Sequence, residues 1–304
     1  MITRYPYREL VWIDIEKPTH EEVRALMDEF DIHPMVADEL LGPSVRPKVD
    51  RHENFIYLVL HFPAIRHSHG SSQAQEIDFI IGKKFLITVR YDAVDPLHKF
   101  SKVFEVNSIL DRSNIGEHAG FLFFYMIRKI YASCIHELEI IRDQLGDAEE
   151  QIFAGRERDM VEQLSVINRD LLTFHRALRQ HEATLNSLAR ASEEFFGNEF
   201  RHWIENVVGE YLKVEEMFED QKEVLANLRE TNNSLLSTKT NDVMKVLTAT
   251  TFSILPASLL GQIFSTRAGG MPLIDSPYAF WIILTGMIIL AGSTYFYFKR
   301  KRWL

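Results

Sequence analysis

One polar stripe near the C-terminus carries the side chains best suited to contact an ion. Taken at alternating steps of three and four residues, this polar stripe consists of Asn241, Met244, Thr248, Thr251, Leu255, Ser258 and Gln262. Neutral amide and hydroxyl oxygens can contact the hydration shell of a cation, and the two apolar residues between them would form constrictions. A membrane-spanning helix does not turn such a face towards lipid. The stripe therefore predicts either a polar seam between helices or the wall of a pore.

The same spacing continues towards the N-terminus through acidic and small polar residues: Asp220, Glu223, Asn227, Glu230, Ser234 and Ser237. Residues 193–230 contain eleven Asp or Glu against four Lys or Arg. Such a run is usually a solvated helix face, but repeated around the axis of an oligomer it would raise the local cation concentration. Glu205, Glu210 and Asp220 are the candidate metal ligands here, although an exposed acid on a helix is ordinary.

The sequence contains none of the usual signatures of an enzyme. It has no nucleophile–base pair, no phosphate-binding glycine loop and no H-E-x-x-H pattern. His67 and His69, with His61 nearby, suggest a metal site at first sight. Histidines in a Ser- and Gly-rich loop without a carboxylate or cysteine between them are more often solvated, because a metal site needs three or four converging ligands. We expect neither an enzyme nor a bound cofactor.

The elements that position the polar stripe are two apolar segments. Between Val243 and Phe264 only Lys245 is charged, and residues 277–298 carry no charge at all. About 20 mostly apolar residues suffice to cross a bilayer, so both segments are predicted to span one. The 304 residues have a net charge of −9, which argues against a nucleic-acid partner, and the single cysteine, Cys134, excludes an intramolecular disulfide framework.

The flanks of the second segment predict its orientation. Positive residues near the end of a span stay in the cytoplasm, and four of them follow directly: Lys299, Arg300, Lys301 and Arg302. Two spans return the chain to the same side, so residues 1 to about 240 are predicted to be cytoplasmic as well. Residues 1–10 lack the apolar core of a signal peptide. We expect a membrane protein with two spans and with both termini in the cytoplasm.

The rest of the chain is predicted to form an α/β domain and long helices. Residues 1–115 read as mixed α/β, with strands at 10–15, 55–62, 76–81 and 85–90, a hairpin over 77–90, and helices at 34–41 and from a Thr19–Glu22 capping box to Phe30. Residues 116–197 read as an antiparallel helical hairpin that turns at 154–156. Residues 198–264 read as one helix on the order of 100 Å long, which continues into the first span at about residue 243. The loop 265–276, the second span 277–298 and the basic tail 299–304 complete the chain.

These features resemble the CorA-type divalent metal ion transporters, the two-transmembrane superfamily that includes magnesium channels and ZntB-like zinc transporters. The resemblance covers nearly the whole chain. At the C-terminal end it rests on residues 243–248, Pro256, Gly270-Met271-Pro272 and KRKRWL at 299–304, and at the N-terminal end on WIDIEKPT at 12–19, DIHPMVADELL at 31–41, RPKVD at 46–50 and IDFIIGKKFLITV at 77–89.

The resemblance implies a fold and an assembly. It implies an α+β membrane protein that forms a funnel-shaped homopentamer, with the first span lining the pore, the second facing lipid and the basic tail ringing the cytoplasmic mouth. Carried over in register, the family's pore-facing positions are Asn241, Met244, Leu247, Leu255 and Ser258. The polar stripe agrees at all of these except Leu247, which lies beside it.

The chain departs from the family at the outer mouth of the predicted pore. In the family a Gly-Met-Asn motif closes the first span, whereas an ungapped count from Pro256 places Ser265-Thr266-Arg267 here. An acidic residue that usually follows Met-Pro is replaced by Leu273, with Asp275 two positions later. A ring of Arg267 side chains would repel a divalent cation. Alternatively, Arg267 points away from the axis towards Asp275 or lipid phosphate, which leaves Thr266 or Gln262 as the first polar ring.

Two functions of different classes follow. The first is transport of a divalent cation, such as Mg²⁺ or Zn²⁺, through a pore of altered selectivity, with the ion as cargo or regulatory ligand. The second is a regulatory or scaffolding membrane protein that keeps the assembly but does not transport. Passage of anions through an arginine ring is a third possibility.

Overall fold

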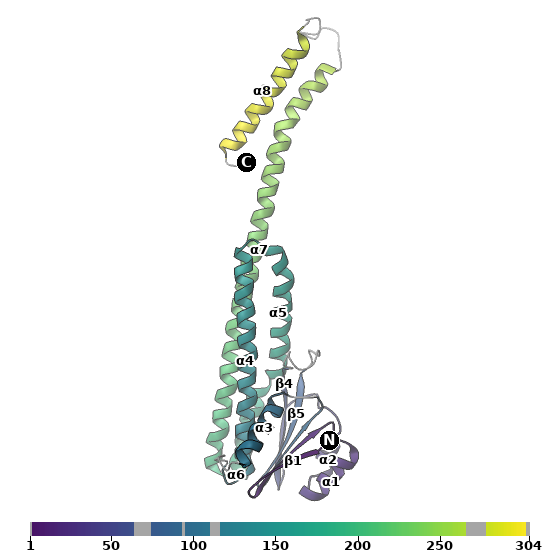
Figure 1. The fold of residues 1–304 in the computed structure, drawn as a ribbon, viewed down its shortest axis with the longest axis vertical. Helices are drawn as coiled ribbons and strands as arrows, with labels where there is room; N and C mark the ends of the chain where they lie inside the picture. The colour runs from purple at the N-terminus through teal and green to yellow at the C-terminus, as the bar shows by residue number, and fades with distance from the viewer. Residues whose placement is uncertain (1, 64–73, 93–94, 110–115, 266–277, 302–304) are drawn as a thin grey trace. The chain divides into compact units, whose positions relative to one another are not determined.

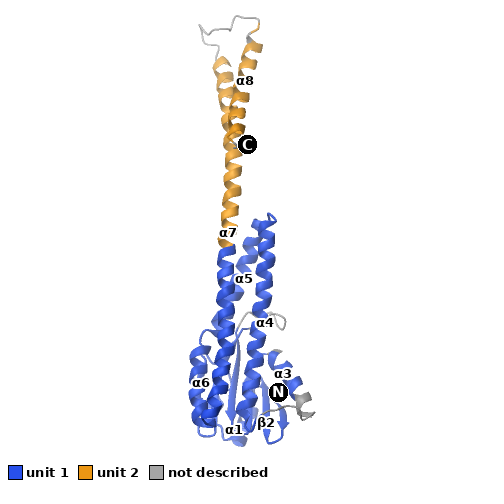
Figure 2. Ribbon diagram, turned by 90° about the vertical axis from the view of Figure 1, so that its left-hand side faces the viewer, with its two compact units in different colours: residues 1–228 blue, residues 229–304 orange. Residues whose placement is uncertain are grey.

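The computed structural model describes residues 2–63, 74–92, 95–109, 116–265 and 278–301. These form two compact units, residues 1–228 and 229–304 (Figure 2). The strands are β1 (Ile2–Tyr7), β2 (Leu10–Glu16), β3 (Lys48–Arg51), β4 (Phe55–Phe62), β5 (Gln75–Gly82) and β6 (Phe85–Arg90). The helices are α1 (His20–Phe30), α2 (Pro34–Glu39), α3 (Asp95–Ile109), α4 (Ala119–Phe153), α5 (Glu157–Leu178), α6 (His181–Phe196), α7 (Asn198–Ser265) and α8 (Ala279–Arg300).

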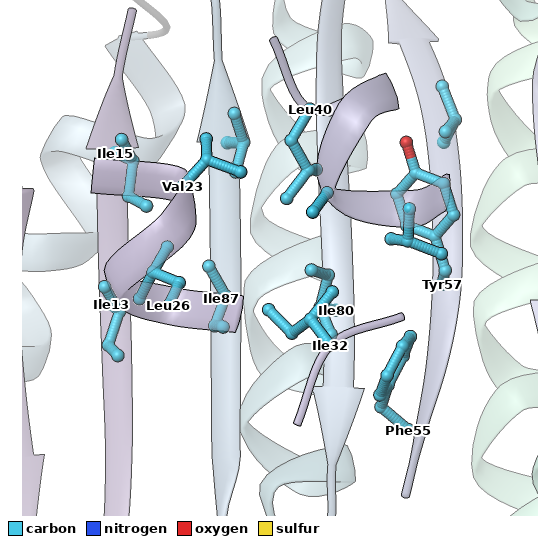
Figure 3. Packing of buried hydrophobic residues seen from close by; sticks show 14 residues of the cluster. Ile13, Ile15, Val23, Leu26, Ile32, Leu40, Phe55, Tyr57, Ile80 and Ile87 are labelled. Carbon is cyan, nitrogen blue, oxygen red and sulfur yellow. The ribbon is translucent and has the colours of Figure 1, made fainter. Parts of the chain in front are cut away.

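The six strands form one mixed sheet in the order β1-β2-β6-β5-β4-β3 (Figure 1). β2 and β6 are parallel, and every other neighbouring pair is antiparallel. Seven of the eight β4 residues are buried, because helices cover both faces of the sheet. Alternate strand residues such as Ile13 and Ile87 pack with Val23 and Leu26 of α1, and Tyr57 of β4 belongs to the same buried cluster (Figure 3). The opposite face meets the long helices, where Phe79 lies edge-on to Phe123 of α4.

Most of the predicted α/β elements are confirmed. Thr19 caps α1 through its side chain, which accepts from the Glu22 amide, and the Glu22 carboxylate accepts from the Thr19 amide in return. β5 and β6 pair antiparallel from Ile77↔Arg90 onwards, as the predicted hairpin requires. The structure also contains β1, β3 and α3, which the sequence did not predict. β1 contains Pro6 and both strands lie at sheet edges, where a regular apolar alternation is not needed.

The prediction that a single helix follows the turn at 154–156 is wrong. Residues 157–196 form two helices, α5 and α6, and the break at Arg179 and Gln180 contains neither proline nor glycine. Directly after the break, His181 is fully buried. Its Nε2 lies 2.8 Å from the His61 carbonyl oxygen and its Nδ1 lies 2.8 Å from the Tyr131 hydroxyl. The break therefore places the imidazole of His181 between the sheet and α4. Because these contacts join residues far apart in sequence, the break could not be predicted from the sequence.

A polar network lies inside the sheet between β2 and β6. Asp14 accepts a hydrogen bond of 2.8 Å from the Thr88 hydroxyl, and its carboxylate lies 3.1 Å from the Arg90 guanidinium. Thr88 in turn accepts from the indole N–H of Trp12 at 3.0 Å. Trp12 and Thr88 are fully buried. Each of these four side chains thus has a hydrogen-bond or ion-pair partner within the network, as burial demands.

The burial of His181 predicts a pH dependence of stability. Burial lowers the pKa of His181 to about 3 from an ordinary value of 6.5. Since the folded-state pKa is depressed, the stabilisation is complete above pH 6.5 and is lost as the pH falls from 6.5 towards 3. At pH 5 the loss from this group is about 2 kcal/mol, at about 1.4 kcal/mol per pH unit.

Thermal unfolding of the full chain in detergent at pH 7 and pH 5 measures this effect. We expect His181→Gln to narrow the difference in unfolding free energy between the two pH values by about 2 kcal/mol. The control is His136→Gln on α4, because the His136 side chain is 70% exposed. An equal pH dependence in His181→Gln and the wild type would contradict the prediction.

Candidate functional site

The polar stripe lies on one uninterrupted helix, because α7 runs from Asn198 to Ser265 with Pro256 inside it. Met244, Leu247 and Leu255 are each more than half exposed within the single chain. Asn241, Thr251, Ser258 and Gln262 are exposed as well, and Thr248 is half-buried. The structure thus places all eight predicted pore-lining residues in α7, and nearly all of them lack cover from the described residues of their own chain.

The opposite side of α7 carries small residues at intervals of four: Ala249, Ser253, Ala257 and Gly261. Ala249 and Ser253 are buried, and the other two are half-buried. A Cβ atom added to Gly261 would lie 3.4 Å from the terminal methyl of Met287 in α8, so the helices approach closely there (Figure 2). Small residues at this spacing let two spanning helices approach. At 3.6 residues per turn these positions lie roughly opposite the polar stripe. α8 therefore lies beside a different face of α7 and leaves the stripe uncovered.

Two hydroxyl groups of the stripe donate to carbonyls of their own helix, which leaves their oxygens free to accept. Thr251 donates to the Leu247 carbonyl at 2.9 Å, and Ser258 donates to the Ile254 carbonyl at 3.2 Å. A hydroxyl that donates back to its own helix keeps its lone pairs available. Those lone pairs can coordinate a cation or accept hydrogen bonds from the water around it. Thr250, off the stripe, makes the equivalent bond to Val246 at 2.9 Å.

The outer mouth and the basic tail are only partly described. Ser265 is the last residue of α7 and is exposed. Thr266, Arg267, Leu273 and Asp275 lie outside the described residues. Lys299 and Arg300 occupy the last turn of α8 and Lys301 follows as its cap, all three exposed, whereas Arg302 lies outside the described residues.

The structure does not bring the predicted metal candidates together. Glu205 accepts from Arg201 at 2.9 Å and lies 3.1 Å from His202, and hydrogen bonds from these two side chains, His202 first, lower its pKa. Glu210 pairs with Arg128 and Lys213, both at 3.2 Å. Asp220 is exposed on the next turns of α7.

Of the three histidines that suggested a metal site, the structure describes His61, which lies in β4. His61 lies 3.1 Å from the Glu76 carboxylate and 3.0 Å from the Ser44 carbonyl oxygen, so its Nε2 already has protein partners. Burial by itself lowers the pKa of His61, but the hydrogen bond and negative charge of Glu76 and the hydrogen bond to Ser44 together outweigh it, so the pKa is raised. His67 and His69 lie outside the described residues.

One group of potential ligands was missed. His175 of α5 lies beside Glu215 and Glu219 of α7, with one ligand atom from each within 4.8 Å of the others. The four-residue spacing of the two glutamates was visible in the sequence, but His175 is 40 positions away from Glu215. Only the packing of α5 on α7 joins them.

Comparison with known proteins identifies a family for this chain. The model of the family described as CorA-like Mg²⁺ transporter protein matches residues 7–300. The cobalt/magnesium transport protein CorA of Methanocaldococcus jannaschii is 25% identical over 97% of this chain and 92% of its own. The zinc transport protein ZntB of Pectobacterium atrosepticum is 20% identical over 96% of this chain and 88% of its own.

A solved structure has the same fold. The complete structure of the CorA magnesium transporter from M. jannaschii superposes with a TM-score of 0.85 at 22% identity, and the match covers 99% of this chain and 93% of that one. The predicted fold class, with an N-terminal α/β domain, long helices and two candidate membrane-spanning helices, is confirmed. By the extent of the family match, the chain belongs to the CorA-like Mg²⁺ transporter family.

Proposed function

We propose that this protein carries divalent metal cations across a membrane through a pore walled by the polar stripe of α7. The observation that carries the proposal is the division of α7 into two faces: small residues on one side, with Met287 of α8 close to Gly261, and uncovered amide and hydroxyl oxygens on the other. In a bilayer such a polar face needs either a protein partner or water. The family consists of ion transporters, so the chain is not an enzyme.

A pore of this kind requires several copies of the chain. One helix cannot enclose a lumen, and the uncovered stripe would be satisfied by the same stripe of neighbouring copies around a common axis. We propose a homopentamer on the family resemblance. Met244, Leu247 and Leu255 would form its apolar constrictions and Lys299–Arg302 its basic cytoplasmic ring. The bacterial inner membrane, with both termini in the cytoplasm, is the proposed location.

The cargo is proposed by class. Names of relatives include cobalt, magnesium and zinc transport, and all three ions are divalent. The neutral oxygens of Asn241, Thr251 and Ser258 suit a cation that keeps much of its water. Because Ser265-Thr266-Arg267 stands where the family keeps Gly-Met-Asn, the selectivity is proposed to differ from that of the magnesium transporters. Neither a resident cofactor nor a nucleic-acid partner is proposed.

Ion flux into proteoliposomes tests the proposal. We expect Mg²⁺, Zn²⁺ or Co²⁺ to move above the background of empty liposomes. Thr251→Val, which keeps the side-chain shape but removes the hydroxyl from the stripe, should reduce flux about fivefold or more, since the loss of a net hydrogen bond of about 1 kcal/mol repeats in each copy. Thr250→Val is the matched control, because Thr250 makes the same 2.9 Å bond off the stripe.

Three results would contradict the proposal. Absence of flux for all three cations favours a scaffolding or regulatory member, and flux of chloride or phosphate in their place favours an anion pore. The positive charge of Arg267 is the feature that supports both alternatives. Equal flux in Thr250→Val and Thr251→Val would place the ion path away from the stripe.

A further inference from the structure

His175, Glu215 and Glu219 form a cluster whose ligand atoms are spaced nearly as they would be around one ion. His175 Nδ1 lies 3.8 Å from Glu215 Oε1, and all three ligand atoms lie within 4.8 Å of one another. Ligands at about 2.1 Å from a tetrahedral ion stand about 3.4 Å apart. Side-chain rotations alone can supply the difference. The three residues belong to one compact unit and lie far from the polar stripe in sequence.

The surroundings hold two of the three side chains in place. The ring of Phe218 stacks on His175 with centroids 4.6 Å apart and planes 15° apart. The Tyr211 hydroxyl donates to Glu215 Oε2 at 3.2 Å, which leaves Oε1 turned towards the imidazole. Glu219 follows Glu215 by four residues, so both carboxylates lie on one face of α7. Oriented ligands with outer hydrogen-bond partners are typical of metal sites.

His175 supplies an independent indication of a missing partner. Its Nδ1 is closed to solvent and makes no hydrogen bond to any described residue. A buried polar atom left without a partner costs about 1–3 kcal/mol. At 3.8 Å the nearest Glu215 oxygen is too distant for a hydrogen bond. An ion between the two would satisfy both atoms.

Lys222 competes for the third ligand. Its Nζ lies 2.8 and 3.0 Å from the Glu219 oxygens. The side chains of this pair are 59% and 51% exposed, and exposed ion pairs contribute about 0–1 kcal/mol. A divalent ion can therefore displace Lys222 from the Glu219 carboxylate. Lys222 therefore weakens a metal site here without preventing one.

We propose that His175, Glu215 and Glu219 bind a divalent transition-metal ion and thereby tie α5 to α7 within one chain. One imidazole and two carboxylates suit Zn²⁺ or Co²⁺, whereas Mg²⁺ takes oxygen ligands almost exclusively. Water completes the coordination at the exposed side of the cluster. The proposal concerns binding by residues outside the apolar spans and holds whether or not the protein transports the ion.

Titration of the full chain in detergent with Zn²⁺ and Co²⁺ tests the site. We expect His175→Ala and Glu215→Gln to remove one bound ion per chain or to weaken its binding about tenfold or more. The Co²⁺ complex of the wild type should show the visible absorption of tetrahedral or five-coordinate Co²⁺, and both variants should lose it. Lys222→Gln should tighten binding, because Glu219 is then free of its competitor.

A matched pair elsewhere provides the control. His136 and Glu139 of α4 lie 3.4 Å apart, and no third described ligand joins them. His136→Ala should leave stoichiometry, affinity and the Co²⁺ spectrum unchanged. The proposal is overturned if His175→Ala behaves like His136→Ala while its unfolding temperature without metal matches the wild type. It is also overturned if Lys222→Gln weakens binding. Flux in Thr251→Val is a separate readout, so failure here leaves the transport proposal intact.

Discussion

Arg267→Asn is expected to raise divalent cation flux in proteoliposomes about tenfold or more. One guanidinium and a divalent ion about 8 Å apart in water repel each other by about 1 kcal/mol. In the proposed homopentamer the repulsions from the Arg267 side chains of the several copies would add, reduced by the screening of the salt. Asparagine removes this barrier and offers a neutral oxygen. The change also restores the residue type that the CorA-type family has at the end of the first span.

Arg267→Lys separates charge from shape in this experiment. It keeps the positive charge, so its flux should stay at the wild-type level, and the advantage of Arg267→Asn should shrink as ionic strength rises. Unchanged flux in Arg267→Asn would mean that Arg267 is turned away from the axis, as an ion pair with Asp275 would require. In that case Gln262 is the next stripe residue to replace.

Asp14→Ala is expected to destabilise the α/β domain by about 3–5 kcal/mol. The Asp14 and Arg90 side chains are each only 11% exposed, and removal of Asp14 leaves the buried Arg90 guanidinium dependent on the carboxylate of Glu16, which lies 3.1 Å away and is 40% exposed. Thr88 loses its acceptor at the same time. For a chain of this size the change corresponds to a fall in unfolding temperature of about 10 °C.

Two further variants make this measurement specific. Glu9→Ala removes one partner of the Lys84–Glu9 pair, whose side chains are 68% and 80% exposed, and should have almost no effect. The double variant Asp14→Ala with Arg90→Met should recover part of the loss, because it removes the buried guanidinium together with the buried carboxylate that it pairs with. A fall of less than about 2 °C in Asp14→Ala would show that the network contributes little.

Local signals made much of the fold predictable. The Thr19–Glu22 capping box, the β5–β6 hairpin and the two apolar segments each depend on residues close in sequence, and the structure has all of them. The motifs shared with the CorA-type family made the fold class predictable. Edge strands were missed because β3 has four residues without apolar alternation and β1 includes Pro6. The predicted segment boundaries and the role of the polar stripe remain predictions.

The candidate sites likewise divide into those with a local signal in the sequence and those formed by residues distant in sequence. The spacing of the stripe on α7 is a property of one helix, so 3.6 residues per turn sufficed to find it. The partner of an ion pair is often distant in sequence. Arg128, 82 positions from Glu210, pairs with its carboxylate, so Glu210 is no longer a good candidate for a metal ligand. The cluster of His175 with Glu215 and Glu219 joins two helices and had no local signal.

By itself the sequence determined the apolar spans, the polar stripe, the charge distribution and the replacement of Gly-Met-Asn by Ser265-Thr266-Arg267, because each is a pattern along one chain segment. Only the tertiary structure decided which face of α7 lies beside α8, where the helical arm breaks before His181, and which acids are already paired. These depend on contacts between segments distant in sequence, and a side chain's partner, exposure and pKa are set by those contacts.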